Sequence, residues 1–170
     1  MNPNITYPSK GHIDVDNFLL IRRCLTTAED PELTVCYGLQ ELFLVRDMLY
    51  SYPRSFKFPN ANPHTWPEFM PILDRISNQI HLDNISQSWF NVSKQSGFMQ
   101  SHSHLLAISS VLVYYPRLEN NHTSIEFLIE NEWIPVPCIS GDWLHFPKEM
   151  EHRVPAGPDN SGRISISINL

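Results

Sequence analysis

The sequence predicts a mostly β fold in which helices from the first half of the chain cover a sandwich of short strands from the second half. Residues 85–170 divide into short runs of alternating or β-branched residues, separated by turns. The last run, 163–170, alternates polar and aliphatic side chains at every position, which is typical of a strand. With 14 prolines and 6 glycines, the chain also has the composition of a protein with many turns.

We expect a single domain over residues 1–170, because this length can bury one hydrophobic core and is short for two. Residues 1–84 are predicted to be mainly helical support and loop. Residues 85–170 are predicted to form a β core of about eight strands.

Proline positions and hydrophobic spacing organise the first half of the chain. Residues 1–12 are expected to form an irregular arm, and pattern alone does not assign the short apolar run at 18–21. Residues 33–50 and 67–80 carry apolar residues near 3.6-residue spacing, so each is predicted to be a helix covering a sheet. The four prolines of residues 52–67 predict a loop, which is a candidate entrance wall together with the polar turn at 116–123.

The second half reads as a series of short strands. After a first strand at 85–92 and a turn at 94–97 come a strand holding two histidines and then further strands at 105–115, 124–129, 133–136, 141–146, 152–154 and 163–170. Prolines at 135 and 137 favour an edge position for the strand at 133–136. One face of the closing strand carries Arg163, Ser165, Ser167 and Asn169. We expect helices to cover its aliphatic face and the polar face to line a pocket.

Composition excludes several classes of protein. The formal net charge of −6, without any basic run, argues against a nucleic-acid partner held by general electrostatics. The three cysteines are an odd number without paired spacing, which favours a reduced intracellular protein over a disulfide framework. The first residues lack a signal-peptide pattern, and no apolar run approaches the roughly 18 residues of a membrane span. We therefore expect a cytoplasmic protein; its oligomeric state is not indicated.

A pair of histidines two residues apart is the strongest chemical signal. On a strand, His102 and His104 would point to the same face, and a neighbouring strand could bring His152 to the same point. Three neutral imidazoles can bind iron, zinc, copper or nickel. The alternative is that the pair are surface or packing residues. Of the remaining histidines, His145 is the one we expect to line a pocket.

Arg163 is the second signal, because it opens the alternating strand 11 residues after His152. An arginine on the inner face of a strand is costly unless it meets an anion, and its planar fork matches a carboxylate. Ser165 shares that face and could donate to the same carboxylate. The alternative for Arg163 is a surface salt bridge.

Five motifs together resemble the iron(II)- and 2-oxoglutarate-dependent oxygenases. They are His102-Ser103-His104, Tyr114-Tyr115-Pro116, Gly141-Asp142 with Phe146-Pro147, Glu151-His152-Arg153-Val154-Pro155 and Arg163-Ile164-Ser165-Ile166-Ser167. The resemblance covers residues 85–170 and is greatest to a branch with H-x-H, tandem tyrosines and an R-I-S-I-S ending. It implies a double-stranded β-helix, or jelly roll, with supporting N-terminal α-helices.

The resemblance also implies an activity and a metal. Fe(II) would be bound by His102 and His152, with His104 in the position where most members have a carboxylate. The cosubstrate would be 2-oxoglutarate, decarboxylated to succinate as O2 oxidises a C–H bond of an unknown small molecule or peptide. A third histidine departs from the usual set of two histidines and one carboxylate, and three histidines with an open position also describe a catalytic zinc site.

Four further residues would bind the cosubstrate. By resemblance, Arg163 and Ser165 would hold the distal carboxylate of 2-oxoglutarate. Asn91, on the strand before His102, and Tyr115 would line the same pocket.

Two other classes remain open from the residues alone. A cupin-like metalloprotein that does not use 2-oxoglutarate would also have H-x-H and a distant histidine in a jelly roll. Cupins usually add a glutamate soon after H-x-H, whereas residues 105–110 contain no acid. The other class is a non-enzymatic jelly roll that binds or supports a partner and retains no metal.

Overall fold

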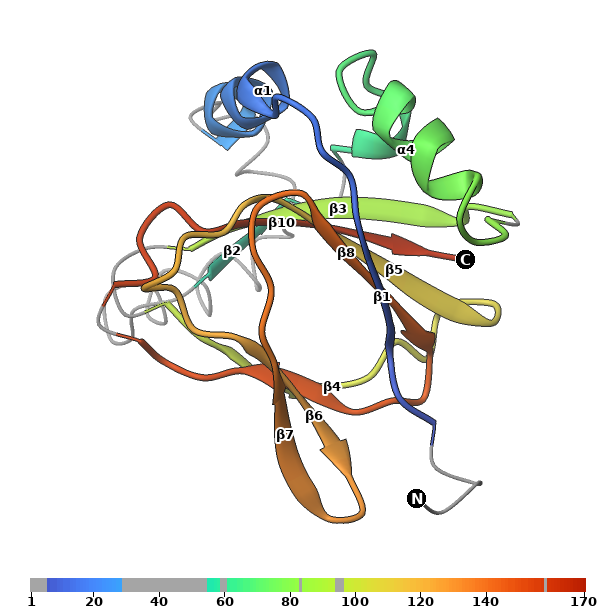
Figure 1. The fold of residues 1–170 in the computed structure, drawn as a ribbon, viewed down its shortest axis with the longest axis vertical. Coiled ribbons are helices and arrows are strands. Elements are labelled where there is room, and N and C mark those ends of the chain that lie inside the picture. The colour runs from blue at the N-terminus through green and yellow to red at the C-terminus, as the bar shows by residue number, and fades with distance from the viewer. Residues whose placement is uncertain (1–5, 29–54, 59–60, 83, 94–96, 158) are drawn as a thin grey trace, which may run out of the picture.

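The computed structural model describes residues 6–28, 55–58, 61–82, 84–93, 97–157 and 159–170. Its elements in chain order are β1 (Ser9–His12), α1 (Phe18–Ala28), β2 (Ser55–Phe58), the 3-10 helix η1 (Pro63–Thr65), α4 (Met70–Ser77), β3 (Gln87–Ser93), β4 (Met99–His102), β5 (Ser110–Arg117), β6 (Ile125–Ile129), β7 (Glu132–Val136), β8 (Asp142–Pro147), β9 (His152–Val154) and β10 (Ile164–Asn169). The predicted mostly β fold with helical support is confirmed (Figure 1).

Two antiparallel sheets form the body of the protein. The larger has the order β1-β8-β5-β10-β3-β2, and the smaller has the order β4-β9-β6-β7. Neighbours in each sheet are mostly not consecutive in sequence, which is the crossing pattern of a jelly roll. Helices α1 and α4 lie over the outer face of the larger sheet, and the smaller sheet lies on its other side (Figure 1). β7 is an edge strand, as its prolines predict.

Two hydrophobic cores meet at the larger sheet. The first, which we call the helix-side core, packs Leu20 of α1 and Ile72 of α4 against Ile166 of β10. The second lies between the two sheets, where Phe127 of β6 packs with Phe146 of β8. We call the space between the sheets the barrel interior. β10 is buried along its whole length and faces both regions.

The first strand, β1, lies within the predicted irregular arm at 1–12, so that prediction is wrong for residues 9–12, while residues 1–5 lie outside the described residues. β1 pairs with β8 and places Gly11 opposite Trp143. A Cβ at Gly11 would lie 2.3 Å from Cζ2 of Trp143, so the close approach requires glycine. Lys10 and His12 each contact the buried Asp142 carboxylate at 2.8 Å. Contacts with residues far along the chain hold this strand, and no local pattern reveals them.

The rest of the first half is partly as predicted. The unassigned run at 18–21 begins α1, whose first N–H, at Phe18, donates to Asp16 Oδ1 at 2.8 Å. The helix expected at 67–80 is confirmed as α4. The loop expected at 52–67 contains β2 and η1, so that prediction is wrong in part. The helix predicted at 33–50 lies outside the described residues.

The largest difference from the predicted strands of the second half lies at residues 105–109. The strand expected at 105–115 begins only at Ser110, because residues 105–109 form a turn. The hairpin turn after β6 is centred on Glu130 and Asn131, whose φ angles of 51° and 66° are those of a tight two-residue turn. None of the described helices is long and apolar enough to cross a membrane.

Candidate metal centre

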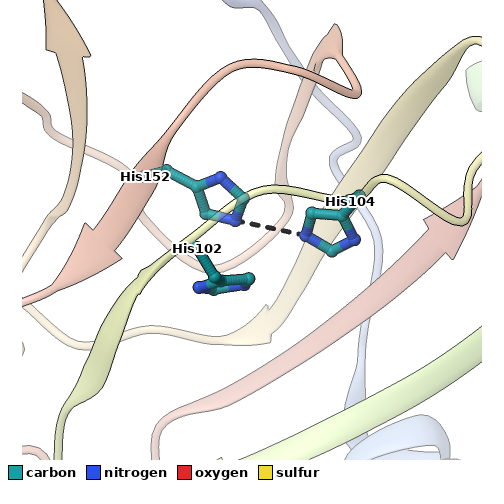
Figure 2. A group of neighbouring side chains, drawn as sticks. All are labelled: His102, His104 and His152. Atoms are coloured by element: carbon teal, nitrogen blue, oxygen red, sulfur yellow. Dashed lines mark hydrogen bonds between the residues drawn. The ribbon is translucent and has the colours of Figure 1, made fainter.

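His102, His104 and His152 converge on one point, as the sequence predicts. His102 ends β4 and His152 begins β9, where the two residues are direct partners in the antiparallel register. His104 lies two residues beyond β4, and its backbone N–H donates to the carbonyl of Lys148 at 2.8 Å. The expectation that both residues of H-x-H lie on one strand is therefore wrong, since the second ring is presented by the irregular segment between β4 and the turn at 105–109. Figure 2 shows the three rings turned toward one another.

The spacing of the ring nitrogens fits a single cation. One nitrogen from each ring lies within 4.8 Å of the other two. Nε2 of His104 and Nε2 of His152 are 3.2 Å apart (Figure 2). Two nitrogens bound to one metal at about 2.0–2.1 Å lie about 3.0–3.4 Å apart at right-angled or tetrahedral coordination. The observed separation falls in that range.

Hydrogen bonds on the far side of each ring decide which nitrogen faces the centre. Nδ1 of His102 lies 2.8 Å from the carbonyl of Gln100, and Nδ1 of His152 lies 3.0 Å from that of Met150. Nδ1 of His104 lies 3.1 Å from Oδ1 of Asn169. Carbonyl oxygens only accept hydrogen bonds, so each Nδ1 carries the proton. Three Nε2 lone pairs then face a common point, an arrangement that a cation satisfies.

The environment of His152 favours its neutral form. His152 is 2% exposed and packs against the rings of Phe127 and Phe146. Burial, with smaller contributions from His102 and His104, lowers the pKa of His152 to about 3. Trp89 stacks on the ring of His104 with 5.3 Å between ring centres. A neutral, immobilised imidazole is the form that binds a metal.

A narrow cavity of about 20 Å³ runs from the histidines to Arg163 and Ser165 in the barrel interior. Arg163 is 2% exposed, and its Nε has no hydrogen-bond partner. Among the described residues, no ion pair joins Arg163 to an acidic side chain. Burial lowers the pKa of Arg163, and its guanidinium lies 5.2 Å from the ring centre of Tyr115. The alternative of a surface salt bridge is therefore wrong.

Two neutral groups in this cavity are also unsatisfied. The hydroxyl of Tyr115 and Oδ1 of Asn91 are buried without a hydrogen-bond partner, and Nδ2 of Asn91 donates to Ser165 Oγ at 3.3 Å. Leaving one buried polar group unpaired costs roughly 1–3 kcal/mol. An arginine Nε and a hydroxyl donor that both lack hydrogen-bond partners among the described residues are complementary to a buried anion.

Asn169 is the site residue for which the sequence analysis gave no role. It is 3% exposed at the end of β10, and it orients His104 through the Nδ1 contact. Its place on the same strand face as Arg163 was a signal in the sequence. The backbone carbonyls that orient His102 and His152 leave no such signal. His145, expected to line a pocket, instead contacts Ser110 Oγ at 2.9 Å and lines neither cavity described here.

Comparison with known proteins gives a match in structure alone. No family model and no curated protein matches the sequence. A prolyl-4-hydroxylase from Pseudomonas putida superposes with a TM-score of 0.64 at 15% identity, covering 95% of this chain and 91% of that one. A member of the 2OG-Fe(II) oxygenase family from Burkholderia pseudomallei gives 0.52 at 10% identity, covering 93% and 91%. HygX from Streptomyces hygroscopicus, solved with nickel and 2-oxoglutarate, gives 0.52 at 11%, covering 78% of each chain.

This chain has the fold of the 2OG-Fe(II) oxygenases. The resemblance read from the sequence motifs is thereby confirmed at the level of the fold, and the jelly roll it implies is the one observed. Identities of 10–15% carry no information about substrate or reaction.

In this oxygenase fold the histidines border a second, open pocket of about 440 Å³. Trp89, Asn91 and Met99 line both the pocket and the inner cavity, so the two spaces meet beside the histidines. The described residues of the two predicted entrance walls, 52–67 and 116–123, do not line the pocket. The turn at 105–109 contributes to its wall instead, through Leu105 and Leu106.

Proposed function

We propose that this protein is an iron(II)- and 2-oxoglutarate-dependent oxygenase that hydroxylates a substrate C–H bond. The observation that carries the proposal is the pairing of two features in one cavity. One nitrogen from each of three imidazoles converges at its outer end, and at its inner end lies a buried arginine that has no carboxylate partner among the described residues. A metal-chelating dicarboxylate satisfies both ends at once, whereas a metal alone leaves the arginine unpaired.

His102, His104 and His152 would hold the iron through Nε2. When bound, the iron supplies the oxygen chemistry, in which O2, 2-oxoglutarate and R–H give R–OH, succinate and CO2. The protein's part is to hold the three rings in one tautomer and orientation through the acceptors at Nδ1. Phe127, Phe146 and Trp89 surround the rings with apolar surface and so limit access of water.

Arg163 and Ser165 would bind the distal carboxylate of 2-oxoglutarate, and the Tyr115 hydroxyl could donate to the same group. Asn91 would hold Ser165 in place through the hydrogen bond between them. The cavity is too narrow for a five-carbon dianion, so its walls must move apart on binding. Met99 is the wall best able to move, because its unbranched side chain has several accessible rotamers.

Because three neutral imidazoles do not offset the charge of a bound metal, the dianion 2-oxoglutarate would contribute strongly to the stability of the metal centre. No acidic side chain belongs to the cluster of ligand candidates found among the described residues. The metal therefore keeps its full charge until an anion arrives, and the two charges of 2-oxoglutarate offset it. We expect metal and cosubstrate to strengthen each other's binding.

The test uses anaerobic addition of iron(II) followed by 2-oxoglutarate. An oxygenase should give the weak visible metal-to-ligand absorption of the chelate, and Arg163→Ala should lose it at the same cosubstrate concentration. His152→Ala should lose metal binding altogether. Unchanged metal content in His152→Ala would contradict the proposed ligand set.

The same experiment separates the alternatives. A cupin-like metalloprotein predicts metal binding without the chelate band, and a non-enzymatic jelly roll predicts neither. The three-imidazole donor set specifically favours a catalytic zinc site as the second candidate. For that candidate, zinc content should persist after purification without added metal, and 2-oxoglutarate should have no effect on metal affinity.

A further inference from the structure

The open pocket beside the histidines has an unusual lining for an acidic protein. Apart from the two imidazoles at its base, none of the described side chains that line it is ionisable. Four carboxamides line it, from Gln87, Asn91, Gln100 and Asn169. The remaining described walls are two serines, two aromatic rings, one methionine and two leucines.

The two leucines are held at the mouth by an anchored turn. Leu105 is 72% exposed and Leu106 is 87% exposed. Between them and β5, Ala107 is buried and its N–H donates to the carbonyl of His104 at 2.9 Å. The N–H of Ser109 donates to the carbonyl of Leu170 at 2.8 Å. The backbone thus fixes both leucines toward solvent next to the pocket, and neighbouring exposed apolar side chains mark a binding surface.

We infer that the primary substrate enters this pocket as an uncharged, amide-bearing segment with an apolar side group. The inference rests on the proposed function and names the substrate class for the same site. A charged segment would lose hydration without gaining an ion pair from the described walls, which is costly. Carboxamides offer both donors and acceptors, so they match amide groups of a substrate, and the two leucines match its apolar group.

The reaction is compatible with this class of substrate. Hydroxylation exchanges a C–H bond for C–OH while 2-oxoglutarate and O2 become succinate and CO2, so the substrate stays uncharged. The carboxamides of Gln87 and Gln100, to which no role at the metal centre is assigned, could bond the new hydroxyl group in place of water.

The test compares three dipeptides that share one leucyl-alanyl core and differ at a single end, which sets their charge. They are N-acetyl-leucyl-alaninamide, which is neutral, N-acetyl-leucyl-alanine, which is an anion, and leucyl-alaninamide, which is a cation. Each is titrated into protein loaded with zinc(II), which is diamagnetic, and 2-oxoglutarate, and binding is followed by NMR at the backbone amides of Leu105 and Leu106. The neutral dipeptide should bind at least about 10-fold more tightly than either charged one. Equal affinities, or tighter binding of a charged dipeptide, would overturn the inference.

Variants in the exposed turn locate the binding. Leu106→Glu should weaken binding of the neutral dipeptide at least about 10-fold, by loss of apolar contact and gain of a charge. Ile108→Glu is the matched control, because Ile108 lies in the same turn, is 61% exposed and does not line the pocket. It should leave the affinity unchanged. Equal effects of the two substitutions would place the dipeptide elsewhere and refute the inference.

Two further measurements are needed. One distinguishes a peptide substrate from a small molecule, and the other distinguishes failure of this inference from failure of the proposed oxygenase function. N-cyclohexylacetamide carries one amide and one apolar ring, so tighter binding of it than of the neutral dipeptide identifies a small molecule, and the reverse identifies a peptide. The chelate band is recorded independently with iron. A band without preference for the neutral dipeptide refutes the inference alone. Preference without a band refutes the oxygenase and leaves the chemistry of the pocket standing.

Discussion

The two faces of β10 are equally buried and chemically opposite. The apolar face carries Ile164, Ile166 and Ile168, each 0% exposed in the helix-side core, and the polar face carries Ser165, Ser167 and Asn169, which are 4%, 6% and 3% exposed in the barrel interior. Burying the first set stabilises the fold, whereas burying the second is costly unless every group is paired. Buried polar atoms of Arg163, Asn91 and Tyr115 lack hydrogen-bond partners among the described residues. The polar face therefore lowers the stability of the fold while it forms the candidate binding site.

The largest effect should come from the apolar face. Ile166→Ala should lower the free energy of unfolding by about 2–5 kcal/mol, because it leaves a cavity in the helix-side core. The metal affinity of the folded fraction should not change. Ser167→Ala, the next residue on the opposite face, is the matched control and should cost less than about 1 kcal/mol. Urea unfolding measures both, and equal losses would erase the contrast between the faces.

On the polar face, a substitution at Arg163 should lower ligand affinity without lowering the stability of the fold. Arg163→Leu should leave the free energy of unfolding unchanged or raise it, since a buried cation without an acidic partner is removed. The affinity for 2-oxoglutarate should fall by about 2–5 kcal/mol, or at least about 30-fold. Urea unfolding and titration of the chelate band measure the two quantities.

Arg117 supplies the control for that substitution. It pairs with Glu119 at 2.7 Å on the surface, and Arg117→Leu should change neither stability nor cosubstrate affinity by much. A large loss of stability in Arg163→Leu would mean that the guanidinium makes stabilising interactions within the protein and is not a binding site for a ligand carboxylate.

Substitutions at Asn169 test whether the polar face of β10 also supports metal binding. Asn169→Ala should weaken metal binding about 10–100-fold, because the ring of His104 loses the acceptor that fixes its tautomer. Asn169→Asp should retain or strengthen binding, since a carboxylate accepts the same hydrogen bond. Competition with a chromophoric chelator measures the affinities, and the ¹⁵N shifts of the His104 ring report its tautomer. Equal affinities of wild type and Asn169→Ala would remove Asn169 from the site.

The smallest effect is the dependence of apoprotein stability on pH. The pKa of His152 is about 3 in the folded protein and about 6.5 in an unfolded chain, so the unfolded state binds more protons between these values. Stability is therefore complete above pH 6.5 and should fall by about 1 kcal/mol between pH 6.5 and 5.5. His152→Phe should flatten this slope. Burial also lowers the pKa of His145, so a weaker slope should persist in that variant.

The sequence predicts this molecule best where local pattern and tertiary structure agree. The alternation of β10 is readable because one face is wholly aliphatic, and the order of its polar face pointed to Arg163 and Ser165. The position of His104 was predicted correctly for the wrong reason, since His104 lies beyond the end of β4, just before the turn at 105–109. The turn was missed because Leu105, Leu106 and Ile108 look like strand residues and are in fact exposed.

What could not be predicted depends on distant partners. The segment Ser9–His12 has no strand-like alternation, and it is a strand because it pairs with β8 and contacts Trp143 and Asp142. The acceptors at His102 and His152 are backbone carbonyls, which every residue possesses. Likewise, the narrowness of the cavity follows from the packing of two sheets and from no single segment.

The pairing of β1 with β8 has a consequence for how the chain assembles. Ser9 finds its strand partner at His145, so β1 cannot form the observed pairing until β8 has been synthesised. Contacts between such distant segments form slowly, because closing a long loop costs conformational entropy before the contacts can offset that cost. During translation β1 therefore stays unpaired with β8 until late, and its docking on β8 should be among the last steps of folding.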